Sequence, residues 1–121
     1  MLNFIMKNEK KMKRDKWYQL QEWIANHFKE LDSYARSTKA SGARGEKGDV
    51  KNSLGLNVEA KCYQKKNVWN VDWLEKCEAE IPLHSDKIAI VVTENKEEKK
   101  HVHLKFEDFW EIYKRSIKNE S

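Results

Sequence analysis

The chain has 121 residues, which is enough for one domain with a single modest core and too few for two. It is 39% hydrophobic and 36% charged, and its five Trp, four Tyr and four Phe supply the core material that a disordered chain lacks. Lys and Arg number 24 against 20 Asp and Glu, giving a net charge of +4, which favours a polyanionic partner without requiring one.

The cysteines and the apolar segments indicate the compartment. Cys62 and Cys77 have no third or fourth cysteine beside them, so the sequence indicates neither a disulfide scaffold nor a zinc knuckle. No apolar run approaches membrane-spanning length, and the apolar start over residues 1–6 is too short for the core of a signal peptide. We therefore expect a cytoplasmic protein without a membrane partner.

The first 14 residues are expected to form a basic N-terminal arm, followed by a single domain over residues 15–118. Residues 7–16 carry a positive excess and little apolar content, which favours a disordered tail over an arm that contacts phosphates. From Asp15, a candidate cap, to about Leu31, apolar residues recur at spacings of three and four. This pattern predicts an amphipathic helix whose buried face carries Trp17, Leu20, Ile24, Phe28 and Leu31.

Gln21 falls inside the apolar stripe of this first helix, three residues before Ile24 and seven before Phe28. Glu22 lies about 100° further round, toward the edge of the stripe. An interior glutamine either bonds to nearby backbone or lines a polar site. The sequence leaves both alternatives open.

The middle of the chain predicts short strands around a loop. Residues 33–38 read as a short strand, and residues 39–48 form a basic loop with three glycines that lacks the Lys-Ser/Thr pair of a phosphate loop. A strand over Asp49 to Lys51, a turn and a second strand over residues 56–62 follow. In the second strand Leu56, Val58, Ala60 and Cys62 alternate with Asn57, Glu59 and Lys61, so one face is apolar and the other is polar.

The remainder predicts a helix, two strands and a final helix. The helix runs from Asn70 or Asp72 to about Glu80 with a buried stripe of Val71, Leu74, Cys77 or Glu78, and Ile81, and residues 87–93 form a strand covered on both faces. Residues 101–105 form a strand with Val102 and Leu104 inward, and a helix carrying Phe106, Phe109, Trp110, Tyr113 and Ile117 closes the domain. The predicted class is α/β, with a mixed central sheet flanked by helices.

Two carboxylates and a lysine form the candidate active site. Asp49 and Glu59 are ten positions apart, so a hairpin would bring both to one point, where a hard cation such as Mg²⁺ or Mn²⁺ would relieve their repulsion. Lys61 shares the strand face of Glu59, and its ammonium group can orient a water and offset phosphate charge. Together with a metal ion, these groups suit phosphodiester hydrolysis, although Glu and Lys also alternate on many solvated strands.

The surroundings of these residues resemble the signature of the PD-(D/E)XK nuclease superfamily, and most closely its small Holliday-junction-resolvase-like and phage-encoded members. The core match is Gly48-Asp49 followed by Val58-Glu59-Ala60-Lys61, with nine residues between Asp49 and Glu59 and with Gly48 where the signature has proline. Shorter similarities cover roughly residues 17–113; they are Leu20-Gln21-Glu22-Trp23-Ile24, Arg36-Ser37-Thr38, Gln64, Asn67-Val68-Trp69 and Glu107-Asp108-Phe109.

This resemblance implies a metal-dependent DNA endonuclease with a restriction-endonuclease-like αβββαβ core, in the host cytoplasm if a phage encodes it. Asp49 and Glu59 match the metal-binding acids and Lys61 the catalytic lysine, while Gln21, or Glu22 if the helix is rotated, completes the site. Branched DNA such as a Holliday junction is a candidate substrate, and the expected phosphate contacts are Arg36, Lys39, Arg44, Lys65 and Lys66.

The sequence leaves three further points open. A DNA-binding module that does not cut is the alternative function, because fold alone does not establish activity. Junction cleavage generally uses two active sites in a symmetric dimer, so a homodimer is among the expected partners. The aromatic residues of the later helices are expected in the core, although Trp69, beside Lys65 and Lys66, is also suited to stacking on a base.

Overall fold

The computed structural model describes residues 2–38 and 48–120, with side chains described from Asp15 onward. The elements follow one another in the predicted order and confirm an α/β protein. They are α1 (Leu2–Phe28), β1 (Arg36–Ser37), β2 (Val50–Lys51), β3 (Leu56–Cys62), α2 (Val71–Ala79), β4 (Ile88–Glu94), β5 (Lys100–His103) and α3 (Phe106–Glu120).

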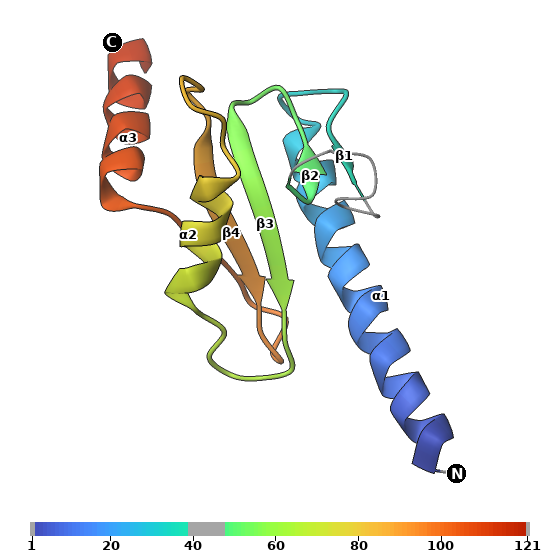
Figure 1. Cartoon of the computed structure of the whole chain (residues 1–121). Coiled ribbons are helices and arrows are strands. Elements are labelled where there is room, and N and C mark those ends of the chain that lie inside the picture. Colours follow the sequence, from blue (N-terminus) through green and yellow to red (C-terminus); the bar gives the residue numbers. More distant parts are fainter. Residues whose placement is uncertain (1, 39–47, 121) are drawn as a thin grey trace.

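The strands form two sheets, where we expected one. The larger sheet has the order β3-β4-β5, with β3 and β4 parallel and β4 and β5 antiparallel, so the predicted mixed character is confirmed. Strands β1 and β2 pair with each other in a separate antiparallel ribbon. This ribbon lies beside β3 and next to the C-terminal end of α1 (Figure 1).

Helices cover both faces of the larger sheet, with α1 on one side and α2 on the other (Figure 1). On the α1 side, Leu20 and Ile24 pack against Val58 and Ala60, and the indole of Trp17 donates a 3.0 Å hydrogen bond to the Ala60 carbonyl. On the α2 side, the buried cluster consists of Leu74, Cys77, Ala89 and Val91. Strand β4 contributes to both clusters, which confirms that it is covered on both faces.

Helix α1 is longer at its start and shorter at its end than the sequence analysis predicted. It begins at Leu2, so the predicted start at Asp15 is wrong; residues 2–14 contain neither Gly nor Pro and are rich in Lys, which together with their Met, Leu and Arg residues favours helix. It ends at Phe28, where the Asp32 amide bonds back to the Phe28 carbonyl. Leu31 therefore lies beyond the helix and is 83% exposed instead of buried.

Helix α2 agrees with the prediction except at its first residue. The Asn70 side chain caps it by accepting a hydrogen bond from the Asp72 amide, and the helix ends before Pro82. Leu74 and Cys77 are buried as expected, but Val71 is 54% exposed. Contact with the sheet starts with Trp73 and Leu74, so the first residue of the helix has no apolar surface to cover.

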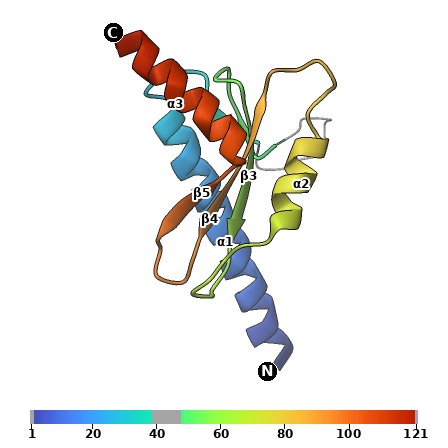
Figure 2. The same ribbon diagram turned by 90° about the vertical axis from the view of Figure 1, so that its left-hand side faces the viewer.

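The C-terminal third departs furthest from the prediction. Val102 is 58% exposed, because β5 is the edge strand and the buried α1-side cluster includes residues of β3 and β4 but none of β5. Helix α3 forms as predicted but does not close the domain. It extends away from the sheet (Figures 1 and 2), and its apolar side chains are exposed, so the expectation that they form core is wrong.

The connection around Gly48 holds the ribbon against the larger sheet. Gly48 has φ +81°, and a Cβ there would lie 2.7 Å from Asn57 Oδ1 and 3.2 Å from the Val58 carbonyl oxygen. Asn57 cannot move aside freely, because its Nδ2 donates a 2.8 Å hydrogen bond to the Cys77 carbonyl. Proline, which the nuclease signature has here, cannot adopt a positive φ, so this backbone requires the glycine.

We predict that Gly48→Ala lowers the free energy of unfolding by about 2–4 kcal/mol, since it combines a positive φ with a steric clash. Gly55→Ala is the matched control: Gly55 has φ +82°, but nothing lies within 4 Å of the place where its Cβ would stand. Its expected cost is about 1 kcal/mol. Urea unfolding of both variants measures the difference, and equal costs would contradict the crowding at Gly48.

Candidate active site

Asp49 is bonded to β3 through both its backbone and its side chain. Its amide donates a 2.7 Å hydrogen bond to the Val58 carbonyl, and its Oδ2 accepts a 2.7 Å hydrogen bond from the Ala60 amide. A side-chain oxygen thus takes the place that a strand carbonyl would occupy in a continuing ladder. Because the Ala60 amide belongs to the peptide group that joins Glu59 to Ala60, the Asp49 carboxylate lies at the backbone between these two residues.

Glu59 and Lys61 project from the opposite face of β3 to Val58 and Ala60, toward α2. Lys61 Nζ lies 3.3 Å from Glu59 Oε1 and 5.5 Å from the centre of the Trp73 ring on α2. Both side chains are partly accessible, at 26% for Lys61 and 19% for Glu59. The structure therefore places Glu59 and Lys61 in contact on the α2 side of β3, with the Asp49 carboxylate bonded to the backbone of Ala60 between them.

The pKa of Cys77 is raised by burial and in part by the charges of the same carboxylates. Burial raises the pKa of this thiol to about 12, with further upward contributions from the charges of Glu59, Glu80 and Asp49. Both acids of the candidate site therefore act on one buried sulfur atom. At neutral pH the thiol is protonated, and Sγ donates to the Asn57 carbonyl, so Cys77 is a structural residue and not a nucleophile.

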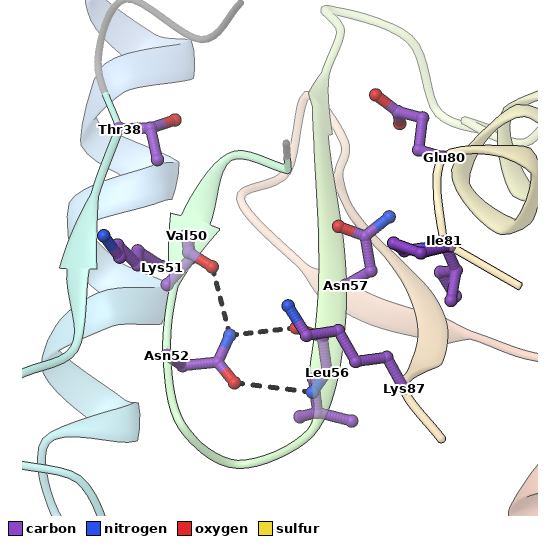
Figure 3. Close-up of a pocket in the computed structure, with 10 residues that line it drawn as sticks. Thr38, Val50, Lys51, Asn52, Leu56, Asn57, Glu80, Ile81 and Lys87 are labelled. Atoms are coloured by element: carbon purple, nitrogen blue, oxygen red, sulfur yellow. Dashed lines mark hydrogen bonds between the residues drawn. The ribbon is translucent and has the colours of Figure 1, made fainter. Parts of the chain in front are cut away.

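A cavity of about 350 Å³ opens next to Asn57, between the β2–β3 turn and the end of α2 (Figure 3). Asn52 fixes the turn by donating hydrogen bonds of 3.0 Å to the Val50 and Leu56 carbonyls. Glu80 lines this cavity and is a carboxylate that the sequence analysis did not select. Glu80 reaches this cavity because it lies at the C-terminal end of α2. Its distance from Asp49 along the chain gives no hint of this position.

Gln21 faces the interior as its place in the stripe predicted, and none of its surface is exposed. Neither atom of its amide has a hydrogen-bond partner in the described part of the chain. Its neighbours Leu20 and Ile24 pack on the Val58 and Ala60 face of β3, whereas Glu59 and Lys61 leave the other face. Gln21 thus belongs to the side of β3 away from those two residues, and its role in the site stays a prediction.

Glu22, the alternative to Gln21, lies at the edge of the helix face. Its carboxylate accepts a hydrogen bond from the Ser37 hydroxyl on β1. In the β1–β2 ribbon Ser37 is paired with Val50, the residue after Asp49, and the amide of Thr38 donates to the Asp49 carbonyl. Glu22 is therefore connected to the backbone beside Asp49 through β1, which leaves the choice between the two residues open.

The residues expected to contact phosphates lie in different parts of the molecule. Lys65 lines a cavity of about 340 Å³ together with Lys61, and Lys66 follows it on the exposed loop after β3. Arg36 lies on the β1 edge, paired with Lys51. Lys39 and Arg44 fall outside the described residues.

The aromatic residues around Lys61 form a connected group. Trp73 stacks on Tyr63 at 5.6 Å and meets Trp69 edge to face at 6.3 Å, while Trp69 stacks on His103 at 4.0 Å. Tyr63 and Trp69 are 41% and 44% exposed and line a cavity of about 370 Å³ with Lys65, so Trp69 is not the core residue we expected.

Strand β5 carries two histidines, His101 and His103, two positions apart. His103 Nε2 lies 2.9 Å from the Thr93 hydroxyl, and its ring is stacked on Trp69. Burial lowers the pKa of His103, and the charge of His101 lowers it further. His103 is thus held by its contacts with Thr93 and Trp69.

The donor set at the sheet edge suits a hard cation bound with few protein ligands. Over residues 2–38 and 48–120 no group of three or more His, Cys, Asp and Glu side chains could hold a metal ion. Mg²⁺ commonly binds proteins through one or two carboxylates and completes its shell with water and phosphate oxygens. Asp49 and Glu59 fit this pattern, whereas they would not satisfy the full protein cage of a structural zinc site.

Comparison of this chain with protein-family models, with curated proteins and with solved structures found no match. The geometry above is therefore the basis for any statement about function. Within the described residues, no helix has the length and apolar character needed to cross a bilayer.

We predict that Gln21→Met raises the free energy of unfolding by roughly 1 kcal/mol or more, because it replaces a buried amide without partners by an apolar side chain of similar shape. Gln19→Met, at an exposed position of the same helix, is the control and should change stability little. Thermal and urea unfolding measure both. A loss of stability at Gln21 would mean that the amide is hydrogen bonded in solution, for example to a buried water.

Proposed function

We propose that this protein is a metal-dependent endodeoxyribonuclease that hydrolyses DNA phosphodiester bonds on a PD-(D/E)XK-like, restriction-endonuclease-like core. The observation that carries the proposal is the hydrogen bond from the Ala60 amide to Asp49 Oδ2, at 2.7 Å. It brings a second carboxylate to a strand that already carries Glu59 and Lys61 side by side. A cytoplasmic location goes with this proposal, since DNA is accessible there.

Each residue of the proposed site has a distinct part. Asp49 and Glu59 would hold Mg²⁺ or Mn²⁺, which supplies polarisation of the phosphate and an activated water when bound. The ammonium group of Lys61 would orient that water and offset the charge that develops on the phosphate oxygens. The face of Trp73 and the partner oxygen of Glu59 hold this amine on the α2 side of β3.

The DNA strand would reach the site along the loop after β3. Lys65 shares one cavity with Lys61 and a second with Tyr63 and Trp69, so it joins the catalytic lysine to exposed aromatic faces. Lysines contact backbone phosphates, and half-exposed aromatic rings accept unpaired bases by stacking. Branched DNA such as a Holliday junction, which presents distorted or unpaired strands, is the proposed substrate class.

A DNA-binding module that does not cleave is the second candidate. The observation that favours it is the first helix, where an uncharged glutamine faces the interior and the neighbouring Glu22 is bonded to Ser37. With Asp49 and Glu59 as its only assigned acids, the site would hold a metal ion more weakly than a site with three.

We predict that Lys61→Ala and Glu59→Ala abolish Mg²⁺-dependent cleavage and leave the fold intact, because both side chains are partly accessible and belong to neither apolar cluster of the described residues. Asp49→Asn keeps an oxygen that can accept the Ala60 hydrogen bond but removes the charge, so it separates metal binding from the structural role. The measurement is a cleavage panel of linear, nicked, flapped and four-way DNA with Mg²⁺ and with Mn²⁺.

Lys76→Ala and Glu75→Ala, at exposed positions of α2, are the matched controls and should cleave like the wild type. Wild-type protein that cuts none of these substrates would refute the nuclease. If it still binds DNA without metal, and Asp49→Asn binds as well or better, the non-cleaving module is the correct function.

We predict that Lys65→Ala combined with Lys66→Ala weakens DNA binding about equally for all sequences. If each lysine neutralises one phosphate, the slope of log K against log salt concentration becomes shallower by about 2. Fluorescence anisotropy with labelled DNA at several salt concentrations measures this slope. Lys87→Ala combined with Lys29→Ala removes the same charge from exposed positions elsewhere in the chain and should leave the slope nearly unchanged. Equal changes of slope for the two pairs of substitutions would indicate a non-specific charge effect.

A further inference from the structure

Helix α3 carries an apolar face that nothing in the described chain covers. Phe106 is 69% exposed, Ile117 is 50% exposed, and Phe109, Trp110 and Tyr113 are each 45% or 46% exposed. None of these residues belongs to either buried cluster of the described residues. The connection before the helix is held to α2 by an ion pair of 2.9 Å between Lys105 and Glu78, while the helix itself extends beyond the body (Figure 1).

A helix in this situation requires a partner to be stable. An isolated helix of about 15 residues is marginal in water, and most helical stability in proteins comes from packing of an amphipathic face. The Glu111–Lys114 ion pair at 2.7 Å supports α3 from within, but an exposed pair of this kind contributes little. Burial of the apolar face against a partner would stabilise the helix more than this ion pair does.

The charges on α3 indicate what the partner is. At about 100° per residue, the apolar side chains form a stripe roughly 100° wide, and four charged residues lie along one border of it. Along that border the first half of the helix is acidic and the second half is basic; the residues are Glu107, Glu111, Lys114 and Lys118. A helix with this order is complementary to a second copy of itself that runs in the opposite direction.

We infer that α3 pairs antiparallel with α3 of a second copy of this chain, forming a two-fold symmetric dimer. In such a pair each border faces the same border of the other helix, in reverse order. The apolar contacts are then Phe106 with Ile117 and Trp110 with Tyr113 of the second copy. The ionic contacts are Glu107 with Lys118 and Glu111 with Lys114 of the second copy.

The same pattern argues against the other occupants of an apolar helix face. A helix that lies on an anionic membrane has basic residues along its polar face, whereas here two glutamates border the stripe at its N-terminal half. In a parallel two-fold pair the charged border of each helix would face the opposite border of the other helix, which carries none of these four residues, so their charges would stay unmatched across the pair. The antiparallel pair satisfies the apolar stripe and the charges together, and it does not depend on the proposed nuclease activity.

Charge reversal of the border provides the test. Lys114→Glu with Lys118→Glu makes the border acidic throughout, and Glu107→Lys with Glu111→Lys makes it basic throughout. We expect the wild type to dimerise in sedimentation velocity, each doubly reversed variant to dissociate about tenfold or more readily, and an equal mixture of the two variants to form a dimer again. Recovery in the mixture shows that neither variant has lost the helix.

Arg115→Glu is the matched control, because Arg115 lies opposite the apolar stripe and should not affect association. A wild-type chain that stays monomeric at high concentration would overturn the inference, whether or not it binds anionic vesicles. Doubly reversed variants that dimerise as tightly as the wild type would also overturn it, as would a mixture that remains monomeric. Trp110→Ser reports independently: it should weaken the dimer while leaving the unfolding of the rest of the domain unchanged.

Discussion

The hydrogen bond from the Ala60 amide to the Asp49 carboxylate is the interaction on which the arrangement at the sheet edge depends. A carbonyl oxygen at this position would continue the ladder from β2 to β3, whereas a carboxylate ends it. The same bond thus separates the β1–β2 ribbon from the larger sheet and brings an acidic group to Glu59. The feature that interrupts the sheet is also the feature that assembles the candidate site.

This bond is kept in place by residues with no chemical role of their own. Gly48 turns the chain with a positive φ against Asn57, and Asn57 in turn is bonded to the Cys77 carbonyl on α2. Cys77 receives the electrostatic influence of both carboxylates across this packed contact. The residues around Asp49 thus connect β3 to helix α2.

The N-terminal and C-terminal helices differ in whether they pack against the core. The later part of α1 covers one face of the sheet from Trp17 to Phe28, so its position is determined by burial. Helix α3 also carries an apolar stripe, but this stripe is exposed and packs on no other element of the described chain. In a two-fold dimer formed through α3, each copy would contribute one Glu59 and Lys61 pair, which is the arrangement that cleavage of two strands of a symmetric DNA substrate requires.

The sequence by itself determined the order and type of the elements and the facing of β3 and of the later part of α1, because these depend on local periodicity. Alternation over residues 56–62 placed Glu59 and Lys61 on one face, and the stripe from Trp17 to Phe28 turned Gln21 inward. Only the tertiary structure decided that Asp49 bonds to Ala60, that Asn57 and Cys77 lie beneath it, and that α3 and Val102 stay exposed. Periodicity states which side of an element is apolar, but burial depends on whether another element lies over that side, and that is set by contacts between residues far apart in the chain.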